Sequence, residues 1–133
     1  MDRHGWIDER LANVPLFANL DKKHLRQISS LATPIDVPEG KALTKEGDIG
    51  HEFIIVLEGE AEVKVGDDIV ATRGPGDYFG EIALINDSPR TATLTARTDM
   101  VCYGMTPWDF RPLVESNSAI AWKLLTAMAE KMK

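Results

Sequence analysis

The strongest chemical pattern in the sequence joins a glycine, a carboxylate and an arginine within a few residues. Gly80 and Glu81 precede a short apolar run at residues 82–84, and Arg90 follows after a turn. A glycine lets a ligand approach the backbone closely, and a helical turn over residues 81–84 would aim free amides at a phosphate. The planar fork of an arginine can bind two phosphate oxygens, and an ionised glutamate accepts hydrogen bonds from hydroxyl groups. The pattern therefore predicts a site for a small phosphate that also carries sugar hydroxyls.

Other reactive side chains are not grouped for catalysis or for metal binding. His4, His24 and His51 are scattered and lack the His-x-His spacing of metal-binding cupin rolls. This disfavours a metal-dependent cupin enzyme and predicts no metal site. The sequence has no nucleophile–base pair and no paired carboxylates, so we expect no catalytic residues and no enzymatic activity. The single cysteine, Cys102, excludes an intrachain disulfide, fits a reducing cytoplasm and is expected to be an inert thiol.

Short strands separated by glycine turns are expected to position the glycine–arginine stretch. Eight of the ten glycines lie between positions 40 and 80. Alternation predicts that Ala61, Val63 and Val65 share one face of a strand. The predicted strands lie at residues 53–57, 61–65, 69–71, 91–96 and 101–105, with a hairpin turn at residues 66–68. Turns about every eight to twelve residues are typical of an antiparallel sandwich or barrel. We therefore expect a mainly β fold, an antiparallel jelly-roll β-roll over residues 34–106.

Helices are expected to flank the roll within a single domain spanning residues 1–133. In the N-terminal helical segment, residues 1–33, Asp21 is placed to cap a helix that buries Leu25 and Ile28. The sequence has no internal repeat and no low-complexity linker, and its length of 133 residues is near the common size of one domain.

Two further helices are expected over residues 107–133. The first has a strong start signal at Thr106-Pro107, and Asn117 or Ser118 can cap the second. The apolar side chains expected on one side of the last helix are Ile120, Ala121, Leu124, Leu125, Met128 and Met132.

Charge and hydropathy limit the partners of the chain. The net charge is −6, and residues 34–106 alone carry six basic and fourteen acidic groups. Such a surface repels nucleic acid backbones, so we expect no direct DNA or RNA binding. No apolar run approaches the ~20 residues of a membrane helix, and the N-terminus lacks the apolar centre of a signal peptide. We therefore expect a cytoplasmic protein with no membrane partner.

Several short motifs occur in a fixed order along the chain. Together they resemble the cyclic nucleotide-binding domains of protein kinase A regulatory subunits, catabolite activator proteins and cyclic nucleotide-gated channels. The resemblance covers roughly residues 11–130, and residues 79–92 resemble the family's phosphate-binding cassette. The segments that fit are Val14-Pro15-Leu16-Phe17, Val37-Pro38-Glu39-Gly40, Gly47-Asp48-Ile49-Gly50, residues 53–59, Phe79-Gly80-Glu81-Ile82-Ala83-Leu84 and Pro89-Arg90-Thr91-Ala92.

The resemblance implies a role for each residue of the candidate site. Arg90 would pair with the exocyclic phosphate oxygens, and Glu81 would accept from the ribose 2′-hydroxyl. Thr91 would lie near the phosphate and the purine, although a purely structural threonine is the alternative. Gly80, Ile82 and Ala83 would approach the ligand through main-chain groups or line its pocket, and Ala92 would lie beside Thr91. His51 departs from the family, which usually has an acid there, and is expected in a turn away from the cassette.

The function implied by the resemblance is that of a non-catalytic sensor. The ligand would be cAMP, with cGMP as the second choice, and no other cofactor is expected. Ligand binding would move the C-terminal helices, which would report to an effector domain or partner protein. Trp122 and Met128 are expected either to pack in the core or to cover the purine. The alternatives are a degenerate domain of the same fold that serves as an interaction module, and a fragment of a larger channel, transporter, transferase or transcription factor.

Overall fold

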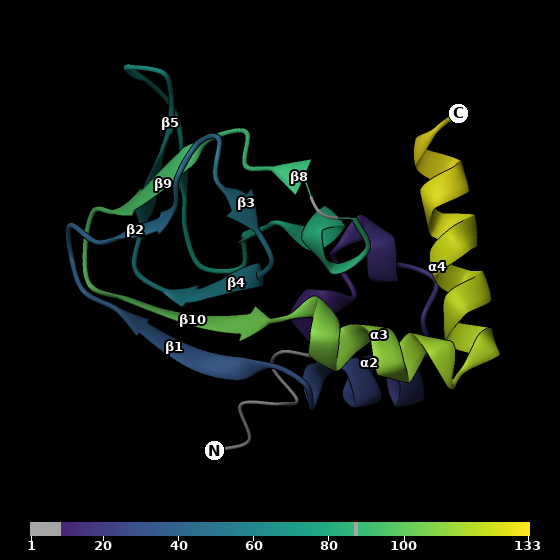
Figure 1. Ribbon diagram of the computed structural model, residues 1–133. Coiled ribbons are helices and arrows are strands. Elements are labelled where there is room, and N and C mark those ends of the chain that lie inside the picture. Colours follow the sequence, from purple (N-terminus) through teal and green to yellow (C-terminus); the bar gives the residue numbers. More distant parts are fainter. Residues whose placement is uncertain (1–8, 87) are drawn as a thin grey trace. The chain divides into compact units, whose positions relative to one another are not determined.

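The chain forms two compact units, shown in Figure 1 as a computed structural model that describes residues 9–86 and 88–133. The first unit, called here the roll, comprises residues 33–107. The second, called the helical unit, combines the segment before residue 33 with residues 108–133. The strands thus come from one continuous segment, and the helical unit comes from both ends of the chain.

The roll is built from short antiparallel strands. Their bounds are β1 Thr33–Val37, β2 Ala42–Thr44, β3 Ile49–Gly50, β4 Phe53–Glu58, β5 Ala61–Val65, β6 Asp68–Arg73, β7 Tyr78–Phe79, β8 Ser88–Pro89, β9 Thr93–Ala96 and β10 Met100–Met105. In the described residues, one four-stranded sheet has the order β1-β10-β4-β7 and another has the order β2-β9-β5-β6. β3 and β8 form a separate pair. The predicted mainly β, antiparallel roll is confirmed.

Apolar side chains from both four-stranded sheets form the core of the roll. Its buried members are Val37, Ile54, Val56, Ala61, Val63, Leu94, Ala96, Met100 and Cys102. The predicted inward positions Ala61 and Val63 are confirmed, but Val65 is 45% exposed. The reason is that β9 pairs with β5 only from Ala61 to Lys64, so Val65 extends past its neighbour to the hairpin turn.

Strand β10 lies between β1 and β4, and side chains on both of its faces are buried along most of its length. Met100 and Cys102 enter the core, and the register shifts between Val101 and Cys102 where β10 pairs with β4. Cys102 is fully buried, and this burial raises the pKa of its thiol to about 11. Because the thiolate is the reactive form, this shift keeps the buried side chain as the protonated thiol at neutral pH.

The helical unit is capped at the positions that the sequence predicts. Its elements are the 3-10 helix η1 (Pro15–Phe17) and the α-helices α2 (Lys22–Ser29), α3 (Pro107–Glu115) and α4 (Ser118–Lys131). The Asp21 side chain accepts from the His24 amide at the start of α2, and Asn117 accepts from the Ile120 amide at the start of α4. The rings of Phe17 and Phe110 meet edge to face at 6.1 Å.

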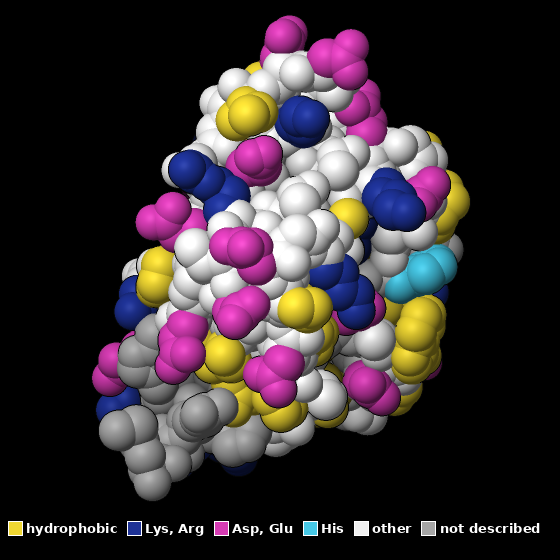
Figure 2. Space-filling view, turned by 90° about the vertical axis from the view of Figure 1, so that its left-hand side faces the viewer, with side chains coloured by type: hydrophobic (Ala, Val, Ile, Leu, Met, Phe, Trp, Pro, Cys, Tyr) yellow, Lys and Arg dark blue, Asp and Glu magenta, His cyan; other side chains and the backbone are white. Residues whose placement is uncertain are grey.

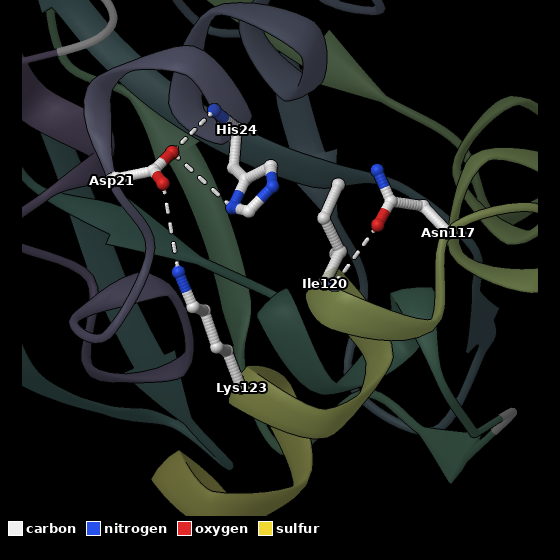
Figure 3. A network of polar contacts seen from close by, with 5 residues as sticks. All are labelled: Asp21, His24, Asn117, Ile120 and Lys123. Atoms are coloured by element: carbon white, nitrogen blue, oxygen red, sulfur yellow. Dashed lines mark hydrogen bonds and ion pairs between the residues drawn. The ribbon is translucent and has the colours of Figure 1, made fainter.

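Polar contacts also join α4 to the segment around the start of α2 (Figure 3). The Asp21 carboxylate lies 3.2 Å from His24 Nδ1 and 3.6 Å from Lys123 Nζ. The amide of Asn19 donates to the Thr126 hydroxyl at 3.2 Å. The hydrogen bond from the His24 amide, with the charges of His24 and Lys123, lowers the pKa of Asp21 against a smaller opposing effect of desolvation. One carboxylate therefore both caps α2 and contacts α4.

The expected apolar side of α4 is only partly buried. Ile120 and Leu124 are buried, whereas Leu125 is 57% and Met132 85% exposed. Trp122 is 67% exposed, so the expectation that it packs in the core is wrong. Because α4 presents its buried positions on a single side, apolar residues at other positions remain at the surface.

Surface charges of both signs are interspersed on the face drawn in Figure 2. Acidic side chains are spread widely there, and lysine and arginine side chains lie between them. A nucleic acid backbone would therefore meet carboxylates across this face. Among the described residues, no helix is both long enough and apolar enough to cross a membrane.

Candidate functional site

The predicted helical turn follows β7 and begins at a glycine. It is the 3-10 helix η2 (Glu81–Leu84), and Gly80 before it has a φ of +83°, in the left-handed region that favours glycine. The Ala83 amide donates to the Gly80 carbonyl at 3.0 Å. Leu84 is fully buried and anchors the turn, whereas Ile82 is 41% exposed.

The turn and the segment leading into β9 line one cavity of about 320 Å³. All the candidate residues chosen from the sequence line it: Gly80, Glu81, Ile82, Ala83, Arg90, Thr91 and Ala92. Thr44, Phe79, Ser88, Pro89 and Leu94 complete the lining. This volume is near the lower end of the ~300–1,000 Å³ range of ligand pockets, so it fits a small ligand.

Arg90 is half-buried and is held by the segment that contains β3. Its Nη2 donates to the Glu52 carbonyl at 2.6 Å. Its backbone amide donates to the Asp48 carbonyl at 2.8 Å, and its own carbonyl accepts from the Gly47 amide at 2.9 Å. Burial lowers the pKa of Arg90, and the negative charge of Glu52 partly opposes this shift. The guanidinium is thus a fixed, partly desolvated cation.

The prediction that the turn with His51 lies away from the cassette is wrong. Three residues of the segment 47–52 form hydrogen bonds with Arg90 through their backbone atoms, namely Gly47, Asp48 and Glu52. In addition, β3 pairs with β8, which ends directly before Arg90. The departure from the family at His51 therefore lies in the segment that holds the arginine. Gly50 and Glu52 were not chosen as site residues from the sequence, although the glycine spacing Gly47-Asp48-Ile49-Gly50 was a usable signal.

Glu81 supplies the negative charge of the cavity. It is the first residue of η2 and is half-buried. Burial, with a further contribution from the Glu81 charge, raises the pKa of Tyr78. Among the described lining residues, Arg90 and Glu81 are the charged ones. The cavity can therefore bind an anion at one residue and accept a hydroxyl proton at another.

Thr44 and Thr91 contribute differently to the cavity. Thr44 is buried, and its hydroxyl donates to the Ala92 carbonyl at 3.0 Å and accepts from the Leu94 amide at 3.2 Å. Thr44 therefore fixes the start of β9, a structural role that the sequence did not reveal. Thr91 lies at the cavity and is exposed, so its side chain is accessible to a ligand.

The described residues contain no group of three or more His, Cys, Asp or Glu side chains that could hold a metal ion. Arg90 and Glu81 line the cavity as a cation and a carboxylate, so an anion and a hydroxyl group can both be recognised there.

Known proteins resemble this chain in sequence and in structure. The family model for the cyclic nucleotide-binding domain matches residues 34–117. A cAMP-dependent protein kinase regulatory subunit of Yarrowia lipolytica is 42% identical over 100 residues, covering 74% of this chain and 27% of that protein. A cyclic nucleotide-gated potassium channel of Rhizobium etli is 35% identical over 111 residues, covering 84% of this chain and 31% of that protein.

A solved structure extends the similarity to nearly the whole chain. The N-terminal domain of a transcriptional regulator from Streptomyces coelicolor matches with a TM-score of 0.84 at 30% identity, covering 92% of this chain and 91% of that one. The chain spans between a quarter and a third of the length of the two curated relatives. The resemblance found in the motifs is confirmed: the chain belongs to the cyclic nucleotide-binding domain family.

Proposed function

We propose that the cavity beside η2 binds a cyclic mononucleotide, cAMP in preference to cGMP. The observation that carries this proposal is the convergence of Arg90 and Glu81 on one small cavity. In the proposed complex, Arg90 pairs with the exocyclic phosphate oxygens and Glu81 accepts from the ribose 2′-hydroxyl. Thr91 and Ala92 lie beside the phosphate and purine, and Gly80, Ile82 and Ala83 line the ribose-phosphate.

The physical character of the cavity suits this ligand. A cyclic phosphate carries one negative charge, and moving it out of water requires a fixed cation. Arg90 is already half-buried and held by Glu52. Phe79, Ile82 and Leu94 add apolar surface to the lining, which a purine and ribose can cover.

The relatives favour a regulatory role for the domain. Their names describe a kinase regulatory subunit and a gated channel, both of which are much longer than this chain. We propose a non-catalytic sensor in which ligand shifts the population of α3 and α4 arrangements and an effector domain or partner protein reads the shift. The exposed polar contacts of Lys123 and Thr126 with the segment around Asp21 are ones that such a shift can exchange at low cost.

Binding itself is tested by calorimetry with cAMP and cGMP side by side, and by thermal melting. Ligand that binds only the folded state stabilises it by about 2.7 kcal/mol at a hundred times its dissociation constant. For a domain of this size, the melting temperature should rise by roughly 8–15 °C. The absence of both heat and a melting shift at millimolar ligand would leave the interaction-module alternative in place.

Replacing Glu81 with alanine should weaken cAMP binding through the ribose. The lost charge-assisted hydrogen bond is worth about 1.5–3 kcal/mol, or roughly 10- to 150-fold in affinity. The loss should largely disappear when the ligand is 2′-deoxy-cAMP, which lacks the hydroxyl. Glu62→Ala is the matched control because Glu62 is also half-buried in the roll but does not line the cavity. Equal losses for both ligands would show that Glu81 does not read the 2′-hydroxyl.

A further inference from the structure

Two glycines leave the space in which the Arg90 side chain lies. A Cβ atom at Gly50 would overlap Nε, Cζ and Cδ of Arg90. A Cβ atom at Gly80 would overlap Nη1 of Arg90 and would lie 2.6 Å from the Glu52 carbonyl oxygen. The guanidinium therefore lies across two positions without side chains, and its Nη2 donates to the Glu52 carbonyl between them.

We propose that Gly50 and Glu52 are positioning residues for the anion site, a proposal that rests on the proposed function. They hold the Arg90 guanidinium at the cavity before any ligand arrives. An arginine has five N–H donors, and the Glu52 bond uses one, so a two-pronged contact with phosphate remains possible. A side chain ordered in advance loses less rotamer freedom when ligand binds, which raises affinity.

Gly50 allows a clean test because its backbone conformation is ordinary. It is not among the glycines with positive φ, so alanine introduces no backbone strain. The atoms that an alanine methyl would meet belong to the flexible Arg90 side chain. The variant should therefore fold normally and displace the guanidinium. Gly80 is less suitable, because its φ is +83° and a Cβ there would also meet the Glu52 backbone.

The experiment compares Gly50→Ala with Gly74→Ala by calorimetry with cAMP. Gly74 also has no positive φ, and a Cβ there would meet nothing within 4 Å. Gly50→Ala should weaken binding by about 10- to 100-fold, the value of a charge-assisted contact, and Gly74→Ala by less than about 2-fold. In an Arg90→Ala background, Gly50→Ala should cost less than about 3-fold, because contacting residues that act together are not additive. Equal losses in the two backgrounds, or no loss at all, would overturn the proposal.

A ligand-free measurement separates this proposal from the proposed function. The Nε–H resonance of Arg90 can be assigned by its loss in Arg90→Ala. It should shift in Gly50→Ala and stay in place in Gly74→Ala. If the parent protein binds no cyclic nucleotide, the proposed function fails, and this resonance still decides whether Gly50 positions the arginine. An unchanged resonance in Gly50→Ala would show that it does not.

Discussion

Replacing Arg90 with alanine is expected to weaken cAMP binding by roughly 30- to 5,000-fold, or about 2–5 kcal/mol. Arg90 is the one positive side chain among the described residues that line the cavity. Without it, the phosphate would lose its water beside Ile82 and Ala83 and gain no cation in return. Calorimetry on the purified variant measures the loss directly.

Two further variants define what the arginine contributes. Arg90→Lys keeps the charge but loses the planar fork, so its affinity should lie between those of the parent and the alanine variant. Arg97→Ala removes an exposed arginine of the same roll and should leave affinity nearly unchanged. Circular dichroism should show both Arg90 variants folded, with a stability loss of about 1 kcal/mol for the bond to Glu52. Parent-like cAMP binding by Arg90→Ala would refute the assigned site.

Gly59→Ala is expected to be the most destabilising small substitution in the roll, costing about 2–5 kcal/mol. Gly59 has a φ of +86°, and left-handed backbone costs an alanine roughly 1–2 kcal/mol. A Cβ there would also overlap the Asp99 carbonyl oxygen and lie 3.0 Å from Met100 Cα. These are backbone atoms of the first residue of β10 and of the residue before it, so relief of the overlap requires a shift of the backbone there, which adds about 1–3 kcal/mol.

Gly40→Ala is the matched control for this collision. Gly40 has a φ of +89°, but a Cβ there would meet nothing within 4 Å. It should therefore show the conformational cost alone, about 1–2 kcal/mol. Urea unfolding with unchanged m-values measures both stabilities. Similar losses of unfolding free energy in Gly59→Ala and Gly40→Ala would contradict this prediction, because they would show that the backbone at the start of β10 shifts without an energetic penalty.

The features predicted correctly from the sequence depend on residues close together in the chain. Asp21 and Asn117 cap helices through amides three residues away. The hairpin of β5 and β6 follows from the turn beside Gly66. By contrast, the exposure of Val65 depends on where β9 ends. Alternation within one strand does not contain this information.

The residues of the candidate site also fall into those that local sequence patterns predicted and those that depend on distant strand pairing. Its lining residues between positions 79 and 92 were found because they form one nearly continuous motif. Thr44, Gly50 and Glu52 were missed because they reach the cavity or Arg90 only through the pairing of β2 with β9 and of β3 with β8. The expectation for His51 failed for the same reason. The local sequence of residues 47–52 does not indicate which distant segment will pair with these residues.

Cys102 can serve as a natural probe of the opening of the roll. It is the only cysteine of the chain, and it lies fully buried on a strand with neighbours on both sides. A thiol reagent can label it only when β10 separates from β1 or β4, or when the whole roll unfolds. The rate of labelling under native conditions therefore reports the local or global opening of the roll, and no cysteine has to be introduced for the measurement. A ligand that binds only the closed roll should lower the logarithm of the labelling rate in proportion to the free energy of stabilisation that it adds.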